Sequence, residues 1–176
     1  MNDGAGIAPG SAPSLIPVCE VVVELGEPLD FGPTRDGARR FTPIVGGELR
    51  GMPGADAGEA VRGLRAAILP GGGDRQLLRA PRPGPGADAA PTVEIDARYD
   101  ARTADGALIG VHAIGIRRVL SGESGRLGST PPRVYFRVML RLETAEPSLA
   151  ELQEALFIAD GVREADRVRH TVYRVG

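Results

Sequence analysis

The sequence predicts an all-β protein, a single closed antiparallel barrel of about eight or nine strands with one short helical turn. Three observations support this prediction. The 25 glycines and 15 prolines among 176 residues divide the chain into short segments. Most segments alternate apolar and polar residues with the period of a strand, and helical periodicity is scarce. Such strands also fit a sandwich, but closure removes exposed strand edges and leaves a lumen for one small ligand, so we favour the barrel.

The length suits one domain, because a chain of 176 residues can bury about 70% of its unfolded surface without disulfides or metal ions. Residues 1–16 are rich in Gly, Ala, Pro and Ser and indicate a flexible leader, followed by a barrel domain over residues 17–176. The leader lacks the basic start and apolar run of a signal peptide, and no stretch approaches the roughly 18 apolar residues of a membrane helix. With a single cysteine, the expected location is the reducing cytoplasm.

Strand patterns begin at residues 19–25, where Val21 and Val23 alternate with glutamates. Weaker patterns follow over residues 40–44, 48–50, 65–69 and 75–78. The run 92–100 alternates more clearly than these, because its charged residues all fall on one face and its apolar and aromatic residues on the other. One face holds Val93, Ile95, Ala97 and Tyr99, and the other holds Glu94, Asp96, Arg98 and Asp100.

Residues 108–118 are apolar on both faces, which is typical of a strand covered on both sides. Asp105 and Gly106 precede this strand and predict a tight hairpin, because glycine adopts the positive φ that such a turn requires. Residues 133–143 alternate again, with an apolar face that includes Phe136. Residues 156–159 and 170–175 complete the predicted strands.

Helix is expected in two short places. Ser148 and Glu151 follow Pro147 with the spacing of a capping box, which predicts one helical turn there. A second turn is weakly indicated over residues 55–64. The Pro- and Gly-rich stretch 80–90 is expected to form a surface loop, since it cannot pair inside a sheet.

The composition excludes several chemistries. All 21 basic residues are arginines, so a lysine Schiff base and a P-loop lysine are both excluded. Cys19, His112 and His170 are too few for a Cys/His zinc cluster. A formal net charge of −2 argues against a surface for nucleic acid. We expect no cofactor, no metal ion, and no membrane or nucleic-acid partner.

Several short sequence blocks occur in order along the chain. They are Glu24-Leu25-Gly26, Gly46-Gly47, Leu69-Pro70-Gly71-Gly72 with Asp74 and Gln76, Asp96-Ala97-Arg98-Tyr99 with Thr103 and Asp105-Gly106-Ala107, Tyr135-Phe136-Arg137, Glu143-Thr144, Leu156-Phe157 and Val172-Tyr173-Arg174-Val175. This ordered set resembles the family known as domain of unknown function 3237, also called uncharacterised protein family 0311. The resemblance implies a small closed β-barrel, similar in outline to the lipocalins, with no settled activity.

The chain departs from the family pattern at two aromatic positions. Arg75 stands where the family usually has Trp, and Glu151-Leu152-Gln153 stands where it usually has Trp-Leu-Asn. An insertion also separates Gly51 from Leu64. If the tryptophans line a ligand in relatives, the resemblance implies a differently shaped and more polar mouth in this chain.

Two charged rows are candidates for a catalytic site. Asp96 and Arg98 project from the same face of one strand, with Cα atoms about 6 to 7 Å apart. If that face lines the barrel, each charge needs a partner, and an ion pair plus a ligand would satisfy both. Tyr135, Arg137 and Glu143 share the polar face of another strand, where a phenol and a guanidinium suit an enolate or a carboxylate. The alternative for both rows is a solvated outer face.

Five further residues are expected to contact the substrate, namely Asp74, Gln76, Glu94, His112 and Phe136. His112 lies among apolar residues, where a histidine is more often part of the core than a catalyst. Gly71 to Gly73 indicate a tight turn and not a phosphate-binding loop, since no helical pattern follows them.

The favoured function is a cofactor-independent isomerase, lyase or cyclase acting on a small carbonyl-bearing metabolite inside the barrel. Asp96 or Glu143 would be the base, Arg98 and Arg137 would stabilise an enolate oxygen, and Tyr135 would donate or relay a proton. A metabolite carrier or sensor with the same pocket is the alternative, and a structural subunit whose strands pair with a partner is a third reading. A homodimer is the default expectation for the assembly.

Overall fold

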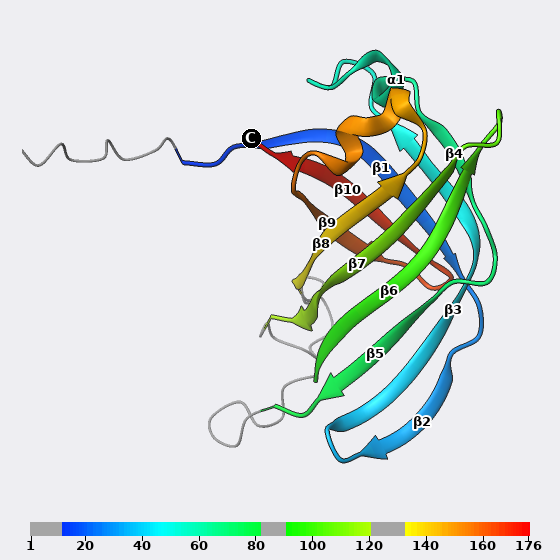
Figure 1. The fold of residues 1–176 in the computed structure, drawn as a ribbon. Helices are drawn as coiled ribbons and strands as arrows, with labels where there is room; N and C mark the ends of the chain where they lie inside the picture. The colour runs from blue at the N-terminus through cyan, green and yellow to red at the C-terminus, as the bar shows by residue number, and fades with distance from the viewer. Residues whose placement is uncertain (1–11, 82–90, 121–132) are drawn as a thin grey trace, which may run out of the picture.

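The computed structural model describes residues 12–81, 91–120 and 133–176, and it shows a closed antiparallel β-barrel (Figure 1). The predicted fold class is therefore confirmed. The ten strands are β1 (Leu15–Leu25), β2 (Leu29–Thr34), β3 (Gly37–Gly51), β4 (Arg65–Ile68), β5 (Gly73–Arg79), β6 (Thr92–Thr103), β7 (Leu108–Val119), β8 (Val134–Thr144), β9 (Phe157–Arg163) and β10 (Arg167–Val175). Two short helical segments accompany them, α1 (Glu59–Arg62) and the 3-10 helix η1 (Pro147–Gln153).

The barrel closes because β1 pairs with β10 on one side and with β3 on the other. From β10 the circuit continues through β9, β8, β7 and β6, then returns to β3 through β4 and β5. Both β4 and β5 pair with β6 and with β3, so they share one position and the circuit has eight positions. Strand β2 pairs with β3 alone and lies outside the circuit.

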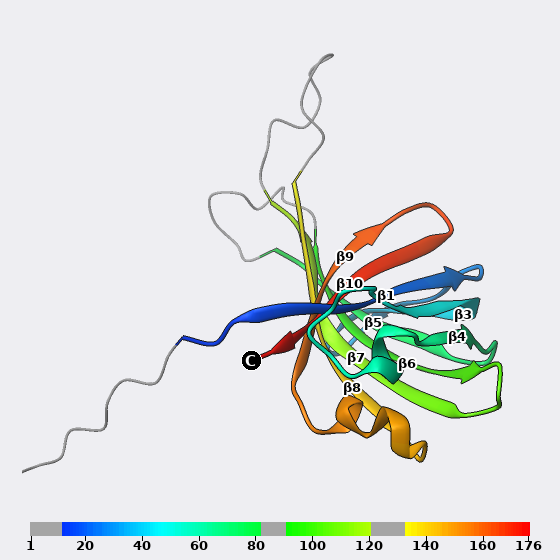
Figure 2. The ribbon, with the colours of Figure 1, turned by 90° about the horizontal axis from the view of Figure 1, so that it is seen from above.

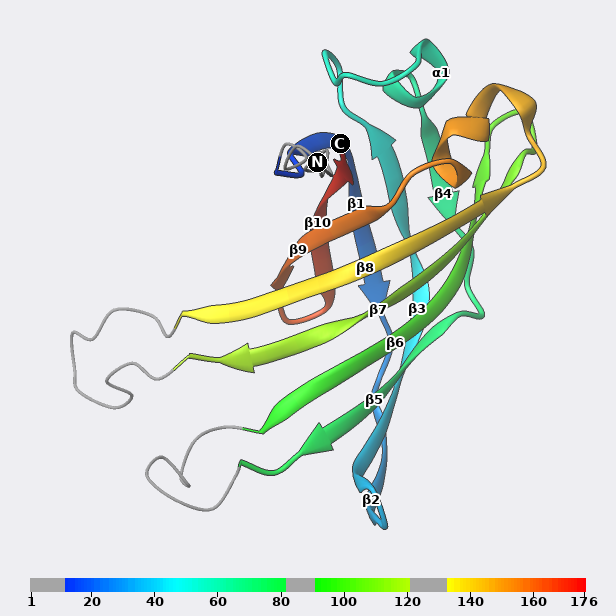
Figure 3. The same cartoon turned by 60° about the vertical axis from the view of Figure 1, so that its left-hand side comes forward.

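Apolar side chains fill the interior of the barrel. On β6, the buried residues are the alternate ones predicted from the sequence, including Ile95 and Tyr99. Strand β8 does the same with Phe136, Val138, Leu140 and Leu142. At one end, α1 and η1 lie close together (Figure 3) and add Val61, Leu149 and Leu152 to the core.

The two ends of the described chain lie side by side (Figure 2). Ser14 and Gly176 exchange two backbone hydrogen bonds of 2.9 and 3.0 Å there. Strand β1 begins at Leu15, inside the segment that the sequence indicates as a leader. No helix in these ranges is long and apolar enough to cross a membrane.

Strand β3 is continuous where the sequence predicts two strands. Its pairing with β1 shifts between Glu24, which pairs with Gly46, and Leu25, which pairs with Ile44, so that Val45 has no partner in the register. Gly47 has a φ of 126°, and a Cβ there would lie 2.0 Å from the carbonyl oxygen of Val22. The irregularity changes which residues face inward, from Thr42 and Ile44 before it to Leu49 after it.

The predicted hairpin and helical turn are both present. Gly106 adopts a φ of 97° between β6 and β7. The turn after Pro147 is η1, but its cap differs from the prediction, because the carboxylate of Glu146 accepts the hydrogen bond from the Ser148 N–H at 3.1 Å. Glu151 instead accepts a hydrogen bond from the N–H of Gly58 at 2.7 Å. The predicted loop at 80–90 lies mostly outside the described residues.

Candidate functional site

The structure places the predicted catalytic row of β6 on the outer surface of the barrel, which contradicts its expected orientation. The side chains of Asp96 and Arg98 are 52% and 72% exposed. The apolar row of the same strand already fills the interior, so the charged row stays in water, where its solvation costs nothing. His112 Nε2 lies 2.8 Å from Asp96 Oδ1 on this outer face. Glu94, expected to contact the substrate, pairs with Arg79 on the same face.

The predicted row of β8 faces outward as well. The Arg137 guanidinium lies 5.6 Å from the centre of the Tyr135 ring. Glu143 pairs with Arg141 at 3.1 Å, with both side chains more than half exposed. Exposed contacts of this kind contribute little to stability, and they do not place the charges in a water-excluded site.

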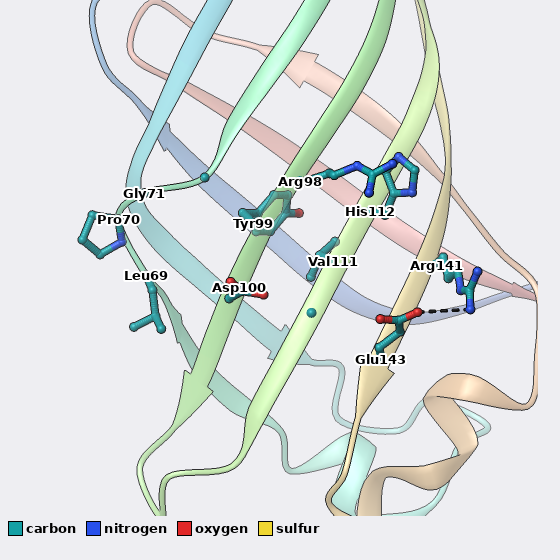
Figure 4. Close-up of a pocket in the computed structure, with 12 residues that line it drawn as sticks. Leu69, Pro70, Gly71, Arg98, Tyr99, Asp100, Val111, His112, Arg141 and Glu143 are labelled. Atoms are coloured by element: carbon teal, nitrogen blue, oxygen red, sulfur yellow. Dashed lines mark ion pairs between the residues drawn. The ribbon is translucent and has the colours of Figure 1, made fainter.

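Some of these residues line a groove of about 680 Å³ on the outside of β6, β7 and β8 (Figure 4). Gly110 lies between Asp100 and Glu143, its register partners on the neighbouring strands, and leaves the groove open there. The structure therefore brings together Arg98, His112 and Glu143, but in a shallow outer groove. The guanidinium groups and carboxylates that line it balance one another in charge.

A second polar group faces the interior, away from α1 and η1. Strand β5 supplies Asp74, which is 8% exposed, and Gln76 beside it. Gln76 Nε2 donates a hydrogen bond to Asp74 Oδ2 at 2.7 Å. The backbone N–H of Asp96 donates to Asp74 Oδ1 at 3.1 Å. The structure thus joins two of the residues that the sequence analysis expects to contact the substrate.

The Asp74 carboxyl is electrostatically unusual. Burial raises its pKa above the ordinary value, and the negative charge of Asp96 acts in the same direction. The hydrogen bonds from Gln76 and from the Asp96 N–H oppose this rise, as does the positive charge of Arg117, but they do not cancel it. A carboxyl with a raised pKa is better matched to giving and taking protons near neutral pH.

The raised pKa predicts how Asp74→Asn changes stability. The pKa of an aspartate in an unfolded chain is about 3.9. Because the pKa of Asp74 is higher in the folded protein, folding disfavours its charged form above that pH. This cost is absent at lower pH, grows as the pH rises, and levels off above the folded pKa. Asparagine removes the cost and keeps an acceptor for the Asp96 N–H. Urea unfolding from about pH 4 to pH 8 should show the variant gaining stability over the wild type as pH rises; a growing advantage for the wild type would contradict this.

Arg117 and, more weakly, Arg163 interact electrostatically with this carboxyl, and Arg40 acts on both of these arginines. Arg117, on the inner face of β7, is half-buried, and burial is the main reason its pKa is lowered. The charge of Asp74 raises the Arg117 pKa and that of Arg40 lowers it. Arg163, at the end of β9, has its pKa lowered first by burial and then by Arg117. Arg40 on β3 is held by Asp30 through two contacts of 3.0 Å.

Phe136 and His170 lie next to this interior group, on the inner faces of β8 and β10. Phe136 is the register partner of Arg117, and its ring meets the His170 imidazole edge to face, with centroids 5.2 Å apart. His170 Nδ1 lies 2.9 Å from the carbonyl oxygen of Asp160, which can only accept, so Nδ1 carries the proton. Burial lowers the pKa of His170, so the ring is neutral at pH 7 with its Nε2 lone pair free of the ring proton.

The sequence patterns did not identify Arg117, Arg163 or Arg40 as site residues, and they gave little reason to select His170. A signal was present for Arg117, because it is the only charged residue on a face that otherwise holds Ile109, Val111, Ala113 and Gly115. Such a charge at the end of an apolar row indicates a polar end of the interior. In the three described ranges, no three His, Cys, Asp or Glu side chains gather as a metal site.

The two positions where the family usually has Trp lie outside this interior group. Arg75 is exposed on the outer face of β5, with its guanidinium 5.1 Å from the centre of the Phe41 ring. Glu151 lies in η1 and binds Gly58. The polar character of the interior therefore comes from other residues than these two.

Comparisons with known proteins agree with the fold. The chain is 30% identical over 166 residues to UPF0311 protein RPA1785 of Rhodopseudomonas palustris, covering 90% of this chain and 94% of that protein. The crystal structure of RPA1785 matches with a TM-score of 0.72 at 29% identity, over 95% of this chain and all of that one. A β-barrel-like protein of Acinetobacter baumannii matches with a TM-score of 0.77 at 25% identity, over 97% of this chain and 100% of that one.

Two fungal proteins are also similar. PR-toxin biosynthesis cluster protein 7 of Penicillium roqueforti is 40% identical over 75 residues, which is 40% of each chain. The crystal structure of an enzyme from Penicillium herquei has the same fold, with a TM-score of 0.60 at 15% identity over 97% of this chain and 99% of that one. The family model described as "Protein of unknown function (DUF3237)" matches residues 13–175. With nearly the whole chain matched, the protein belongs to the DUF3237 family.

Proposed function

We propose that the protein is a cofactor-independent enzyme that moves a proton on a small carbonyl-bearing molecule at the polar end of the barrel interior. The observation that carries this proposal is the Asp74 carboxyl, which is buried, hydrogen-bonded on both oxygens and raised in pKa. Strongly perturbed ionisable groups concentrate at functional sites, because catalysis needs pKa values that solvent does not supply.

Each residue of the interior group has a chemical task. The Asp74 carboxylate removes a proton from the carbon next to the carbonyl, and the electron pair of the C–H bond moves to the carbonyl oxygen. The Arg117 guanidinium stabilises the enolate that forms, since a charge that develops in a partly dry site is strongly stabilised by a fixed cation. Gln76 holds the Asp74 oxygen in place. The buried Phe136 ring helps to exclude water beside the site.

The enolate then has three fates, which correspond to the three reaction classes. An isomerase returns the proton from Asp74 to a different carbon. A lyase lets the electron pair expel a leaving group, which takes the proton. A cyclase uses the electron pair to attack a second carbonyl carbon of the same molecule, whose C=O π bond breaks while its oxygen takes the proton from Asp74. The similarity to a protein named for a toxin biosynthesis cluster supports a substrate from biosynthesis.

The test uses two enolisable ketones, phenylpyruvate and 4-phenylbutan-2-one, in D₂O. Proton NMR follows the replacement of hydrogen by deuterium next to the carbonyl. The wild type should accelerate exchange of at least one ketone, and Asp74→Asn should lower that rate by about 100-fold or more, because a positioned general base contributes that much.

The matched control is Asp100→Asn, on the outer face of β6, which should exchange at the wild-type rate. Equal loss in both variants would place the chemistry in the outer groove and overturn the assignment to Asp74. Absence of exchange by the wild type, with ligand binding retained, would instead make the protein a metabolite carrier or sensor.

A further inference from the structure

The half-buried Arg117 lacks a close counterion at the polar end of the interior. Asp74 is the buried carboxyl at this end. Asp30 neutralises Arg40 through a two-point contact at 3.0 Å. Arg163 is exposed at the end of β9, where the charge of Asp166 acts on it. Among the described residues, no carboxylate lies within 4.0 Å of Arg117.

A half-buried guanidinium without a close partner is costly, because it loses water and gains no ion pair. Arg117 also feels the repulsion of Arg40, and Arg163 that of Arg117. Asp74 compensates only in part, since both of its oxygens already accept other hydrogen bonds. A bound anion would relieve this imbalance, and a carboxylate would match the planar donors of arginine with two parallel hydrogen bonds.

The surroundings of Arg117 indicate what accompanies the anion. Phe136 lies directly opposite Arg117 in the pairing of β7 with β8. The Phe136 ring is 4% exposed and packs against His170 and against Gly161, where a Cβ would lie 2.6 Å from the ring. Val93, the register partner of Arg117 on β6, is also buried and apolar. Arg117 is thus flanked by a buried apolar residue on each neighbouring strand.

We propose that the substrate carries a carboxylate, held by the half-buried Arg117, next to an apolar or aromatic body that suits the apolar residues flanking Arg117. This inference rests on the proposed function for the location of the site, but it concerns binding and not proton transfer. It places the anionic group of the substrate opposite Asp74, so that the carboxylate anchors the molecule and Asp74 meets the carbon beside its carbonyl.

The test measures the binding of two compounds of equal shape that cannot enolise under these conditions, 3-phenylpropionate and 3-phenylpropanamide. Isothermal titration calorimetry should show the wild type binding the acid more tightly than the amide. Arg117→Gln should weaken binding of the acid by about tenfold or more and leave binding of the amide unchanged, because only the carboxylate pairs with the charged guanidinium.

The matched control is Arg118→Gln, the next residue along β7, whose guanidinium lies outside over the Tyr135 ring at 5.7 Å. It should bind both compounds as the wild type does. A measurement without any variant is the salt dependence of the wild type, in which added NaCl should weaken the acid and not the amide. Equal affinity for acid and amide in the wild type, or equal losses in the two arginine variants, would overturn the inference.

The two proposals fail in different ways. If Asp74→Asn abolishes proton exchange while the wild type shows no preference for the acid, the enzyme assignment stands and the anionic substrate does not. If the preference for the acid depends on Arg117 while Asp74→Asn leaves exchange unchanged, the anion site stands and the role of Asp74 does not.

Discussion

Gly115→Ala is expected to destabilise the barrel by about 3 kcal/mol or more, which exceeds the usual cost of an overpacked site. A Cβ at this position would lie 2.1 Å from the carbonyl oxygen of Arg137 and 2.6 Å from the Cα of Val138. Both atoms belong to the backbone of β8, the hydrogen-bonded neighbour of β7. To relieve this steric overlap, the two strands must separate where Gly115 pairs with Val138.

Gly110→Ala on the same strand is the matched control. Its Cβ would meet Asp100 at 3.6 Å and Glu143 at 3.8 Å, which are ordinary contacts. Its cost should be within about 0.5 kcal/mol. Urea unfolding of both variants measures the difference. Similar stabilities for the two variants would mean that the close approach of β7 and β8 is not a fixed feature of the fold.

Phe136→Ala is expected to cost about 3 to 5 kcal/mol, because it removes a buried aromatic ring from the interior. The neighbouring Tyr135→Ala should cost about 1 kcal/mol or less, since Tyr135 is 41% exposed and the guanidinium groups of two arginines lie over its ring face. The comparison tests directly which face of β8 points inward. Urea unfolding at one pH is sufficient, and the reverse order of costs would contradict the orientation of this strand.

The sequence predicted the strands well because alternation of apolar and polar residues is a local property. The runs at 92–100 and 133–143 became β6 and β8, and the Asp-Gly pair became the hairpin turn. Strand β2 escaped prediction because its Gly and Pro interrupt the pattern, and it makes no contribution to the closed circuit. The length of β3 escaped prediction because its irregularity at Val45 shifts the alternation by one residue.

The site was harder to predict, because alternation separates two faces without saying what fills the interior. The charged rows of β6 and β8 were assigned to a hollow barrel, but apolar side chains fill that space and leave Asp96 and Arg98 outside. Asp74 and Gln76 lie instead on β5, a short strand that the sequence pattern predicted only weakly. Gln76 lies on the same strand as Asp74, but Asp96 and Arg117 lie on other strands and become its neighbours only when those strands assemble, which no local pattern reveals.

The hydrogen bond between Glu151 and Gly58 gives a different view of how this chain has diverged from its relatives. Glu151 occupies a position where the family pattern usually has Trp, and Gly58 lies in the insertion between Gly51 and Leu64, 93 residues away along the chain. The contact makes these two departures interdependent. A chimera that restored tryptophan alone would leave the Gly58 amide without its acceptor, and one that deleted the inserted segment alone would leave the Glu151 carboxylate without its donor.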